Sequence, residues 1–173
     1  RTDGDVHFIC DNAGMELAMD LVLADALLNN FSDRVILHIK SYPIYVSDTI
    51  IQDVQTFLQQ LQTGNHSTPI HQFGERLKAA FEAGRIRLAP HVFWNSSRFM
   101  WDMPDSLRQS FEDAQIIFMK GDANYRDAVG DAVWETTTPF EDVVDYFPAP
   151  VLALRTMKSD PIIGLKPGQA EAL

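Results

Sequence analysis

Residues 6–14 read VHFICDNAG, an apolar run that ends at an acid, an amide and a glycine. Val6–Cys10 is typical of a short buried strand, and the four residues after it are typical of a loop that enters a helix. Apolar side chains then recur every three or four residues, which predicts a helix over Met15–Leu28 that ends at two asparagines. Val35–Ile39 has the pattern of a second buried strand. This order predicts a βαβ unit with parallel strands and a right-handed crossover.

The rest of the chain continues the alternation of strands and helices. Further strands are expected at Arg85–Leu88, Ala114–Met119 and Val151–Leu154, and further helices at Thr49–Leu61, His71–Ala83, Asn124–Ala132 and Pro139–Tyr146. The aromatic stretch His91–Pro104 is expected to be irregular and to pack over the sheet, with contact to a substrate as the alternative. No repeat or linker divides residues 1–173. The sequence therefore predicts one α/β domain, a three-layer α/β/α sandwich with a mainly parallel, Rossmann-like sheet.

The composition limits the classes of partner and the location. With 173 residues and 46% hydrophobic content, the chain can bury one globular core. Its net charge of −10 disfavours nucleic acid and anionic membrane surfaces as partners. No apolar run reaches the roughly 18 residues of a membrane span, and the polar first residues do not resemble a signal peptide, so we expect a cytoplasmic or nuclear protein. The single Cys10 excludes an intrachain disulfide and is expected to be a buried thiol.

Polar side chains follow three of the predicted strands. Asp11 and Asn12 come after the first, Asp48 follows the second, and Asp122–Arg126 follows Ala114–Met119. Because the carboxyl ends of parallel strands meet at one edge of a sheet, where open α/β sheets bind ligands, we expect these side chains to converge. Carboxylate and amide oxygens suit Mg²⁺ or Mn²⁺ better than zinc. The alternative is that Asn12 and Asp48 cap the helices that follow them.

Basic side chains also follow the predicted strand ends. They are Lys40, Lys120, Arg126, Arg155 and Lys158. This placement indicates an anionic ligand, whose phosphate oxygens the planar guanidinium of Arg126 can bind and which Lys158 can attract as a point charge. The alternative is a set of salt bridges with local acids such as Asp122 and Asp127.

Several common catalytic motifs are absent from the sequence. It has no Gly-x-x-x-x-Gly-Lys-Ser/Thr loop, no Gly-x-Gly-x-x-Gly after a strand and no Gly-x-Ser-x-Gly elbow. The five histidines show no spacing typical of zinc ligands, so we expect core or surface roles for them. These absences disfavour a P-loop NTPase, a serine hydrolase and a zinc enzyme.

Four short motifs occur in a family order. They are DNAGME at residues 11–16, SD at 47–48, KGDANYR at 120–126 and RTMK at 155–158. With these motifs, nearly the whole chain resembles the domain-of-unknown-function 89 family, the metal-dependent damage-control phosphatases, and the last motif is similar to that of subfamily III. The resemblance implies hydrolysis of phosphomonoesters of sugar phosphates and related damaged metabolites, with a divalent Mn²⁺, Co²⁺, Ni²⁺ or Mg²⁺ ion as cofactor. It also implies a small phosphorylated metabolite as the partner.

The resemblance assigns roles to individual residues. It implies metal binding by Asp11, Asn12 and Asp48. It implies substrate binding by the first two of these and by Asp122, Ala123, Asn124, Tyr125, Arg126 and Lys158. Ala123 stands where relatives usually have Leu, which we expect only to alter packing. Members of the family carry a helical region before the Asp-Asn motif, so the resemblance implies that this chain is a fragment of a longer protein, and the oligomeric state stays open.

These assignments lead to a hypothesis for the reaction. The ion polarises the phosphate and lowers the pKa of a bound water, while Asn124, Arg126 and Lys158 bind the phosphoryl oxygens. Asp122 orients the water, acts as base or supports the metal ligands from behind. Covalent catalysis by Asp11 is the less favoured route, because residue 13 is Ala where aspartyl-phosphate enzymes have a second Asp. The expected catalytic set is Asp11, Asn12, Asp48, Asp122 and Lys158.

Two other functions stay open at this point. One is an S-adenosylmethionine-dependent carboxyl O-methyltransferase, although the Gly-rich strand–loop signature of such enzymes is missing. The other is a sugar-phosphate-binding module without turnover, against which the intact set of expected metal ligands argues.

Overall fold

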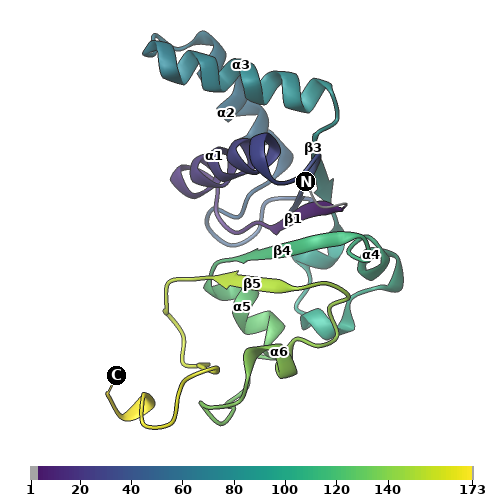
Figure 1. Ribbon diagram of the computed structural model, residues 1–173, viewed down its shortest axis with the longest axis vertical. Helices are drawn as coiled ribbons and strands as arrows, with labels where there is room; N and C mark the ends of the chain where they lie inside the picture. Colours follow the sequence, from purple (N-terminus) through teal and green to yellow (C-terminus); the bar gives the residue numbers. More distant parts are fainter. Residues whose placement is uncertain (1–3, 173) are drawn as a thin grey trace.

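A parallel five-stranded sheet organises the chain in the computed structural model, which describes residues 4–172 (Figure 1). Its strands are β1 (Asp5–Ile9), β2 (Val35–Ile39), β3 (Ile86–Pro90), β4 (Ala114–Lys120) and β5 (Val151–Leu154), in the order β3-β2-β1-β4-β5. Every neighbouring pair is parallel. The chain moves outward from β1 to β3 and then returns to the other side of β1, so the direction of winding changes between β1 and β4. Ligand crevices of open α/β sheets form at such a change.

Helices cover both faces of the sheet, which confirms the predicted three-layer α/β/α sandwich. One layer holds α1 (Met15–Asn30), α2 (Ile51–Thr63) and α3 (Thr68–Glu82). The other holds α4 (Asp105–Gln109), α5 (Asp122–Ala128), α6 (Phe140–Val143) and the 3-10 turns η1 (Val92–Asn95) and η2 (Met100–Asp102). A last 3-10 turn, η3 (Ala170–Ala172), follows β5. Because strand side chains alternate, Phe8 of β1 packs with α1–α3, in the upper part of Figure 1, and Ile9 packs with the opposite layer.

The predicted helix after β1 is confirmed as α1, and its apolar periodicity explains its burial. Residues at spacings of three and four lie on one side of the helix and join the core, namely Leu17, Leu21, Ala24 and Leu28. The helix runs on to Asn30 instead of ending at Leu28. The side-chain amides of Asn29 and Asn30 each donate a hydrogen bond to a carbonyl one turn earlier, so the two asparagines extend the last turn.

The bounds of four other helices differ from the prediction. α2 begins at Ile51 instead of Thr49. α3 begins at Thr68 instead of His71, because residue 69 is a proline and proline is favoured in the first turn of a helix. α5 ends at Ala128, since Gly130 and Asp131 have left-handed backbones with φ of 72° and 46°. α6 is a single turn of four residues.

The aromatic stretch 91–104 packs over the sheet, as expected, and contains η1 and η2. Phe93 and Trp94 are buried in the core of the α4–α6 layer. Trp101 packs so closely on Gly130 that a Cβ on the glycine would lie 1.9 Å from its ring. Neither tryptophan lines the cavities described below. These residues therefore form a packed cover, and the two tryptophans lie outside both cavities.

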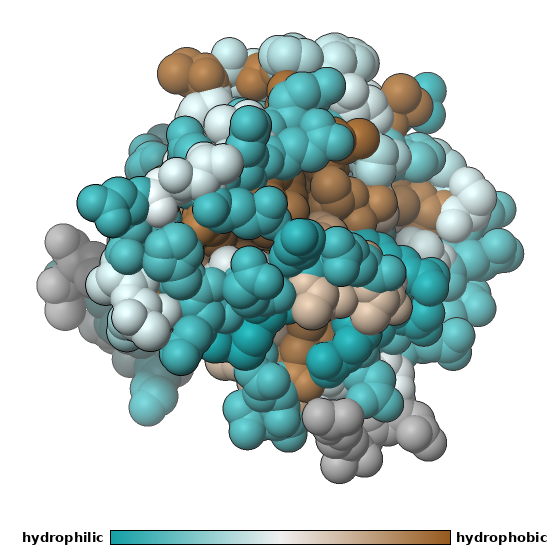
Figure 2. All heavy atoms as spheres, turned by 90° about the horizontal axis from the view of Figure 1, so that it is seen from above, coloured by the Kyte–Doolittle hydropathy of each residue, from teal (hydrophilic) through white to brown (hydrophobic). Residues whose placement is uncertain are grey.

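Two further expectations concern the surface and the thiol. Within residues 4–172, no helix combines the length and the apolar character needed to cross a membrane. The surface seen from above is mainly hydrophilic, and hydrophobic side chains show in a band near the middle of the view and at a few places along its upper edge (Figure 2). Cys10 is free and buried, as predicted.

Candidate active site

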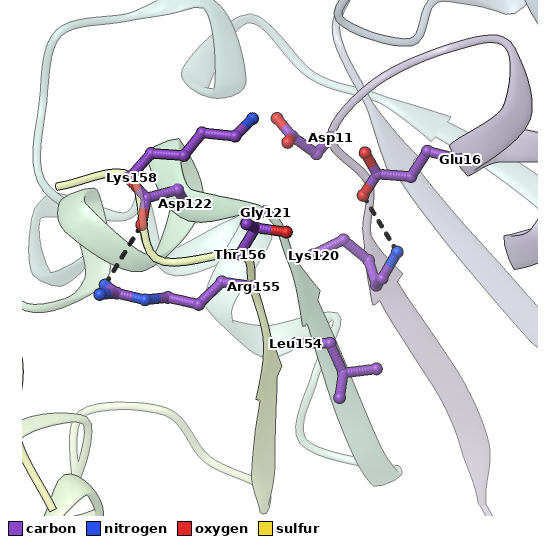
Figure 3. Close-up of a pocket in the computed structure, with 9 residues that line it drawn as sticks. All are labelled: Asp11, Glu16, Lys120, Gly121, Asp122, Leu154, Arg155, Thr156 and Lys158. Carbon is purple, nitrogen blue, oxygen red and sulfur yellow. Dashed lines mark hydrogen bonds and ion pairs between the residues drawn. The ribbon is translucent and has the colours of Figure 1, made fainter. Parts of the chain in front are cut away.

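Two adjoining cavities of about 340 and 480 Å³ open at the carboxyl ends of β1 and β4, where the winding direction changes. Both are lined by Asp11, Asp122 and Lys158, and the smaller one is drawn in Figure 3. Asp11 follows β1, Asp122 begins α5 directly after β4, and Lys158 follows β5. The strand order therefore brings three of the predicted motifs to one crevice, although they lie far apart in the sequence.

The Asp11 carboxylate fits against the backbone of Gly121. The glycine has a left-handed backbone with φ 85°, and a Cβ built on it would lie 2.0 Å from Asp11 Oδ2. Any larger residue would displace the carboxylate. Asp11 itself is buried, with 8% of its surface exposed. The turn after β4 is thus shaped around this acid.

Asn12 and Asp48 face each other across an isolated antiparallel bridge between the ends of β1 and β2. Asn12 Nδ2 donates a hydrogen bond to Asp11 Oδ2 at 2.8 Å, and Ser47 Oγ donates to Asn12 Oδ1 at 2.6 Å. The N-cap positions of α1 and α2 are occupied by other residues, Gly14 and Ile50. The capping alternative is therefore wrong for Asn12 and Asp48, and both side chains lie at the cavity.

Burial partly removes the carboxylates of Asp11 and Asp48 from water. Burial raises the pKa of the Asp11 carboxyl to about 6, and the nearby charges of Glu16 and Asp48 add to the shift. Burial also raises the pKa of Asp48, against the opposing effect of Lys40, whose Nζ lies 3.3 Å from Asp48 Oδ2. A shared cation would relieve the repulsion between two such acids.

The residues present fit a hard divalent cation. The carboxylates of Asp11 and Asp48 and the amide of Asn12 supply oxygen ligands of the kind that Mg²⁺ and Mn²⁺ bind. In the part of the chain that the structure describes, no three His, Cys, Asp or Glu side chains cluster as metal ligands, so the set depends on the Asn12 oxygen. That oxygen faces Ser47 and the NH₂ group faces Asp11, and a 180° rotation of the amide exchanges the two.

Four of the five basic residues that follow the strand ends have acidic partners. The pairs are Lys40–Asp48, Lys120–Asp20, Arg126–Asp131 and Arg155–Asp122. Lys158 forms no hydrogen bond or ion pair with the other described residues, and its ammonium points toward Asp11 across the smaller cavity (Figure 3). The salt-bridge alternative is therefore confirmed for the four paired residues, and Lys158 is the one left to attract an anion.

Arg155 and Asp122 form a buried pair at the smaller cavity. Arg155 Nη1 lies 3.4 Å from Asp122 Oδ1, and neither atom has a hydrogen-bond partner among the described residues. The guanidinium also lies 3.9 Å from the centroid of the Tyr125 ring, which stacks on Phe140. Tyr125 thus supports Arg155 from the core side. Both atoms are buried, so among the described residues each has only the charge of the other as its partner.

Asn124 ties the ends of β1 and β4 together. Its Nδ2 donates hydrogen bonds to the carbonyls of Cys10 at 3.0 Å and Lys120 at 2.8 Å. Both amide hydrogens are therefore used by the backbone and are not free for phosphoryl oxygens. The structure places Asn124 and Tyr125 behind the cavities, whereas Ala123 and Arg126 line the larger one.

Several lining residues are missing from the predicted site set, although one of them, Glu16, ends the DNAGME motif. Glu16 lies four residues after Asn12 and accepts a hydrogen bond from its Nδ2 at 3.2 Å. Asp127 lies four residues after Ala123, and burial raises the pKa of its carboxyl to about 6. Helical spacing could have placed Asp127 beside Ala123, since both lie on α5. Tyr45, at the rim of the larger cavity, lies in a loop where no such periodicity applies.

These features define a class: a doubly wound α/β protein with an acidic, oxygen-rich site at the point where its winding reverses. Comparison with known families makes the assignment specific. The family described as "Damage-control phosphatase ARMT1-like domain" matches the chain over residues 1–173, and the chain belongs to this family.

Curated relatives named Damage-control phosphatase ARMT1 are similar to nearly the whole chain. The protein from Bos taurus is 36% identical over 173 residues, and those from Homo sapiens and Danio rerio are 35% and 37% identical. The alignments cover 97% of this chain but 39%, 39% and 38% of these relatives, so the chain spans about two fifths of their length. A solved structure described as a DUF89 family protein from Pyrococcus horikoshii is 16% identical, with 91% of this chain and 48% of that chain covered and a TM-score of 0.45.

Proposed function

We propose that this chain forms the catalytic core of a divalent-metal-dependent phosphatase that hydrolyses phosphomonoesters of sugar phosphates or related damaged metabolites. The observation that carries the proposal is the meeting of two dehydrated carboxylates, Asp11 and Asp48, with the unpaired ammonium of Lys158 at one cavity. Such acids bind a cation, and the ammonium attracts the phosphate that shares this cation. The relatives' name, damage-control phosphatase, supports the same activity.

The metal would be held by Asp11, Asn12 and Asp48, and an all-oxygen set of this kind accepts Mn²⁺, Co²⁺, Ni²⁺ or Mg²⁺. When bound, such an ion polarises a phosphate and lowers the pKa of a water molecule. Lys158 stabilises the charge that develops on the phosphoryl oxygens. Arg126 offers a second cationic contact at the wall of the larger cavity, once a phosphate replaces its partner Asp131.

Asp122 is the residue that we assign to the attacking water. Its side chain lines a cavity that Asp11 and Lys158 also line, and its Oδ1 is buried against Arg155 Nη1, 3.4 Å away. With Oδ1 held by Arg155, the other carboxylate oxygen can accept a hydrogen bond from water and take its proton. Asp11 is instead held against Gly121 and by Asn12, so we assign it to metal binding and not to covalent attack.

The experiment that tests this function is phosphate release by the full-length protein from a panel of sugar phosphates. Each reaction is run with EDTA and then with added Mn²⁺, Co²⁺, Ni²⁺ or Mg²⁺. Asp11→Asn keeps the size of the side chain and removes its charge, and Asp105→Asn is the matched control, because Asp105 lines neither cavity. Metal-dependent release that is lost in Asp11→Asn and kept in Asp105→Asn is the expected result.

Two outcomes would contradict the proposal. One is the absence of release with every metal in protein shown to be folded. The other is equal activity of the Asp11→Asn variant and the wild type. Titration with S-adenosylmethionine, followed by an assay of carboxyl methylation, would then show whether the methyltransferase alternative holds.

A further inference from the structure

The larger cavity has an apolar rim made by Tyr45 and Val46. Both residues line the same space of about 480 Å³ as Asp11 and Asp48, and they are 73% and 99% exposed. Apart from the small Ala123, the other described lining residues are polar or charged. A cavity with charged groups at the strand ends and one apolar wall suits a ligand that has both a charged and an apolar part.

The loop that carries this rim is fixed on both sides. The backbone N–H of Ser41 donates a hydrogen bond to Asn95 Oδ1 at 2.8 Å, and Asn95 Nδ2 donates to the carbonyl of Tyr42 at 2.9 Å. On the other side, the N–H of Ala13 donates to the carbonyl of Ser47 at 2.7 Å. The tip between these anchors, residues 43–46, is therefore held at a defined position beside the metal ligands.

Tyr45 has a backbone conformation that is unfavourable for a residue with a Cβ. Its φ is 51°, in the left-handed region that residues with a Cβ rarely adopt and that glycine adopts without strain. Packing in the core does not offset this strain, because the Tyr45 ring is mostly exposed. The ring lies near one charged group, Lys40 Nζ, which is 6.0 Å from its centroid. Strained conformations of this kind are concentrated at ligand sites, where the side chain has a task.

We infer that Tyr45 and Val46 form a specificity platform for the carbon part of the substrate, and that this part is a ring. The inference rests on the proposed phosphatase function, since it assumes that the phosphate lies beside Asp11 and Lys158. A pyranose or furanose ring has a face of C–H groups that packs on an aromatic ring, while its hydroxyls stay in water. A short linear ester covers less of the platform. Cyclic sugar phosphates are thus the favoured substrate class.

The test measures binding separately from turnover. Phosphonate analogues of glucose 6-phosphate and glycerol 3-phosphate, which cannot be hydrolysed, are titrated into the metal-loaded full-length protein. In Tyr45→Ala, the ratio of the linear to the ring dissociation constant should fall by about three- to tenfold, which is the range for an aromatic packing contact. Tyr45→Phe keeps the ring and should keep the preference. Tyr42→Ala is the matched control, because Tyr42 is 52% exposed in the same loop and lines neither cavity.

A further variant distinguishes a binding role from a structural one. Tyr45→Gly relieves the strained φ, so its melting temperature should rise while the preference for the ring falls. A structural role would make both fall. The same ratio in wild type and Tyr45→Ala overturns the platform, as does a wild type without preference. Wild-type protein that binds the ring phosphonate through Tyr45 but releases phosphate from no ester would instead overturn the phosphatase and leave the platform standing.

Discussion

Lys40 Nζ and Asp48 Oδ2 lie 3.3 Å apart, and the two side chains are only 8% and 7% exposed. Lys40 also donates a hydrogen bond to the carbonyl of Trp94. An ion pair this deeply buried is costly to break, because the charge that remains has no water to replace its partner. The pair therefore links the stability of the end of β2 to the integrity of the site.

Asp48→Ala is expected to lower the free energy of unfolding by about 3–5 kcal/mol, because the Lys40 ammonium stays buried without its counter-charge. It should also abolish metal-dependent phosphate release. Denaturant unfolding and metal titration measure the two effects. In the double variant Asp48→Ala/Lys40→Met most of the stability should return while metal binding stays lost. An Asp48→Ala protein with full metal affinity and activity would remove Asp48 from the site.

Gly121→Ala is expected to lower both the melting temperature and the metal affinity. The new Cβ meets Asp11 Oδ2 at 2.0 Å, so the carboxylate must move in addition to the strain at φ 85°. Gly168→Ala isolates the effect of backbone strain, since Gly168 has φ 79° and open space around its Cβ position. We expect about 1 kcal/mol of destabilisation for Gly168→Ala and clearly more for Gly121→Ala. Equal losses in the two variants would contradict the close fit between Asp11 and Gly121.

Asn124→Ala should destabilise the protein by about 1–3 kcal/mol, since it removes the donor to the buried carbonyl of Cys10 and the part-buried carbonyl of Lys120. Amide hydrogen exchange at the ends of β1 and β4 should increase. Asn30→Ala is the control, because its amide bonds one exposed helical carbonyl, and we expect a loss of about 0.5 kcal/mol or less. A rise in KM without loss of stability would show instead that Asn124 binds the phosphoryl group.

The buried His7 should make stability depend on pH. Burial lowers the pKa of His7 to about 4, although Asp5 acts in the opposite direction, and the ordinary value is 6.5. Between pH 6.5 and 4 the unfolded chain therefore binds a proton that the folded protein does not bind. Stability should fall as the pH falls through this window, by about 3 kcal/mol for this group.

Urea unfolding of His7→Gln between pH 4 and 6.5 tests this. Asp11 and Asp127 have the opposite effect. Burial raises the pKa of each carboxyl to about 6 in the folded protein, so their contribution to the stability of the protein falls as the pH rises toward 6. The informative quantity is therefore the difference in slope between wild type and variant. His71→Gln, which alters an exposed histidine on α3, should keep the wild-type slope. The same slope in His7→Gln would contradict the prediction.

Much of the fold could be predicted because its signals are local. The buried face of α1 follows from the spacing of Leu17 and Leu21, and β5 has the bounds that its apolar run predicts. The end of α5 could not be predicted, because it depends on the left-handed backbones of Gly130 and Asp131. Those conformations accompany the packing of the distant Trp101 ring on Gly130.

The candidate site likewise has parts that the sequence predicts and parts that it does not. Convergence of Asp11 and Asp122 follows from the rule that parallel strand ends meet, which needs no knowledge of side-chain packing. The partners of Arg155 and Lys120 lie on other elements, so charge alone could not separate the paired cations from Lys158. The role of Asn124 depends on a hydrogen bond to a residue 114 positions away. The rim at Tyr45 depends on a loop conformation without periodicity.

Because of the strand order, the candidate site is complete only after β4 has docked on β1. The hydrogen bond from Asn124 to Cys10 and the ion pair from Lys120 to Glu16 span 114 and 104 residues, and both require β4 to have docked on β1. A chain that has formed β1, β2 and β3 alone has only the Asp11 and Asp48 side of the candidate site. Contacts between residues so far apart in the sequence slow folding. Any ligand that binds across the β1–β4 junction would bind only fully folded molecules and would stabilise the folded state.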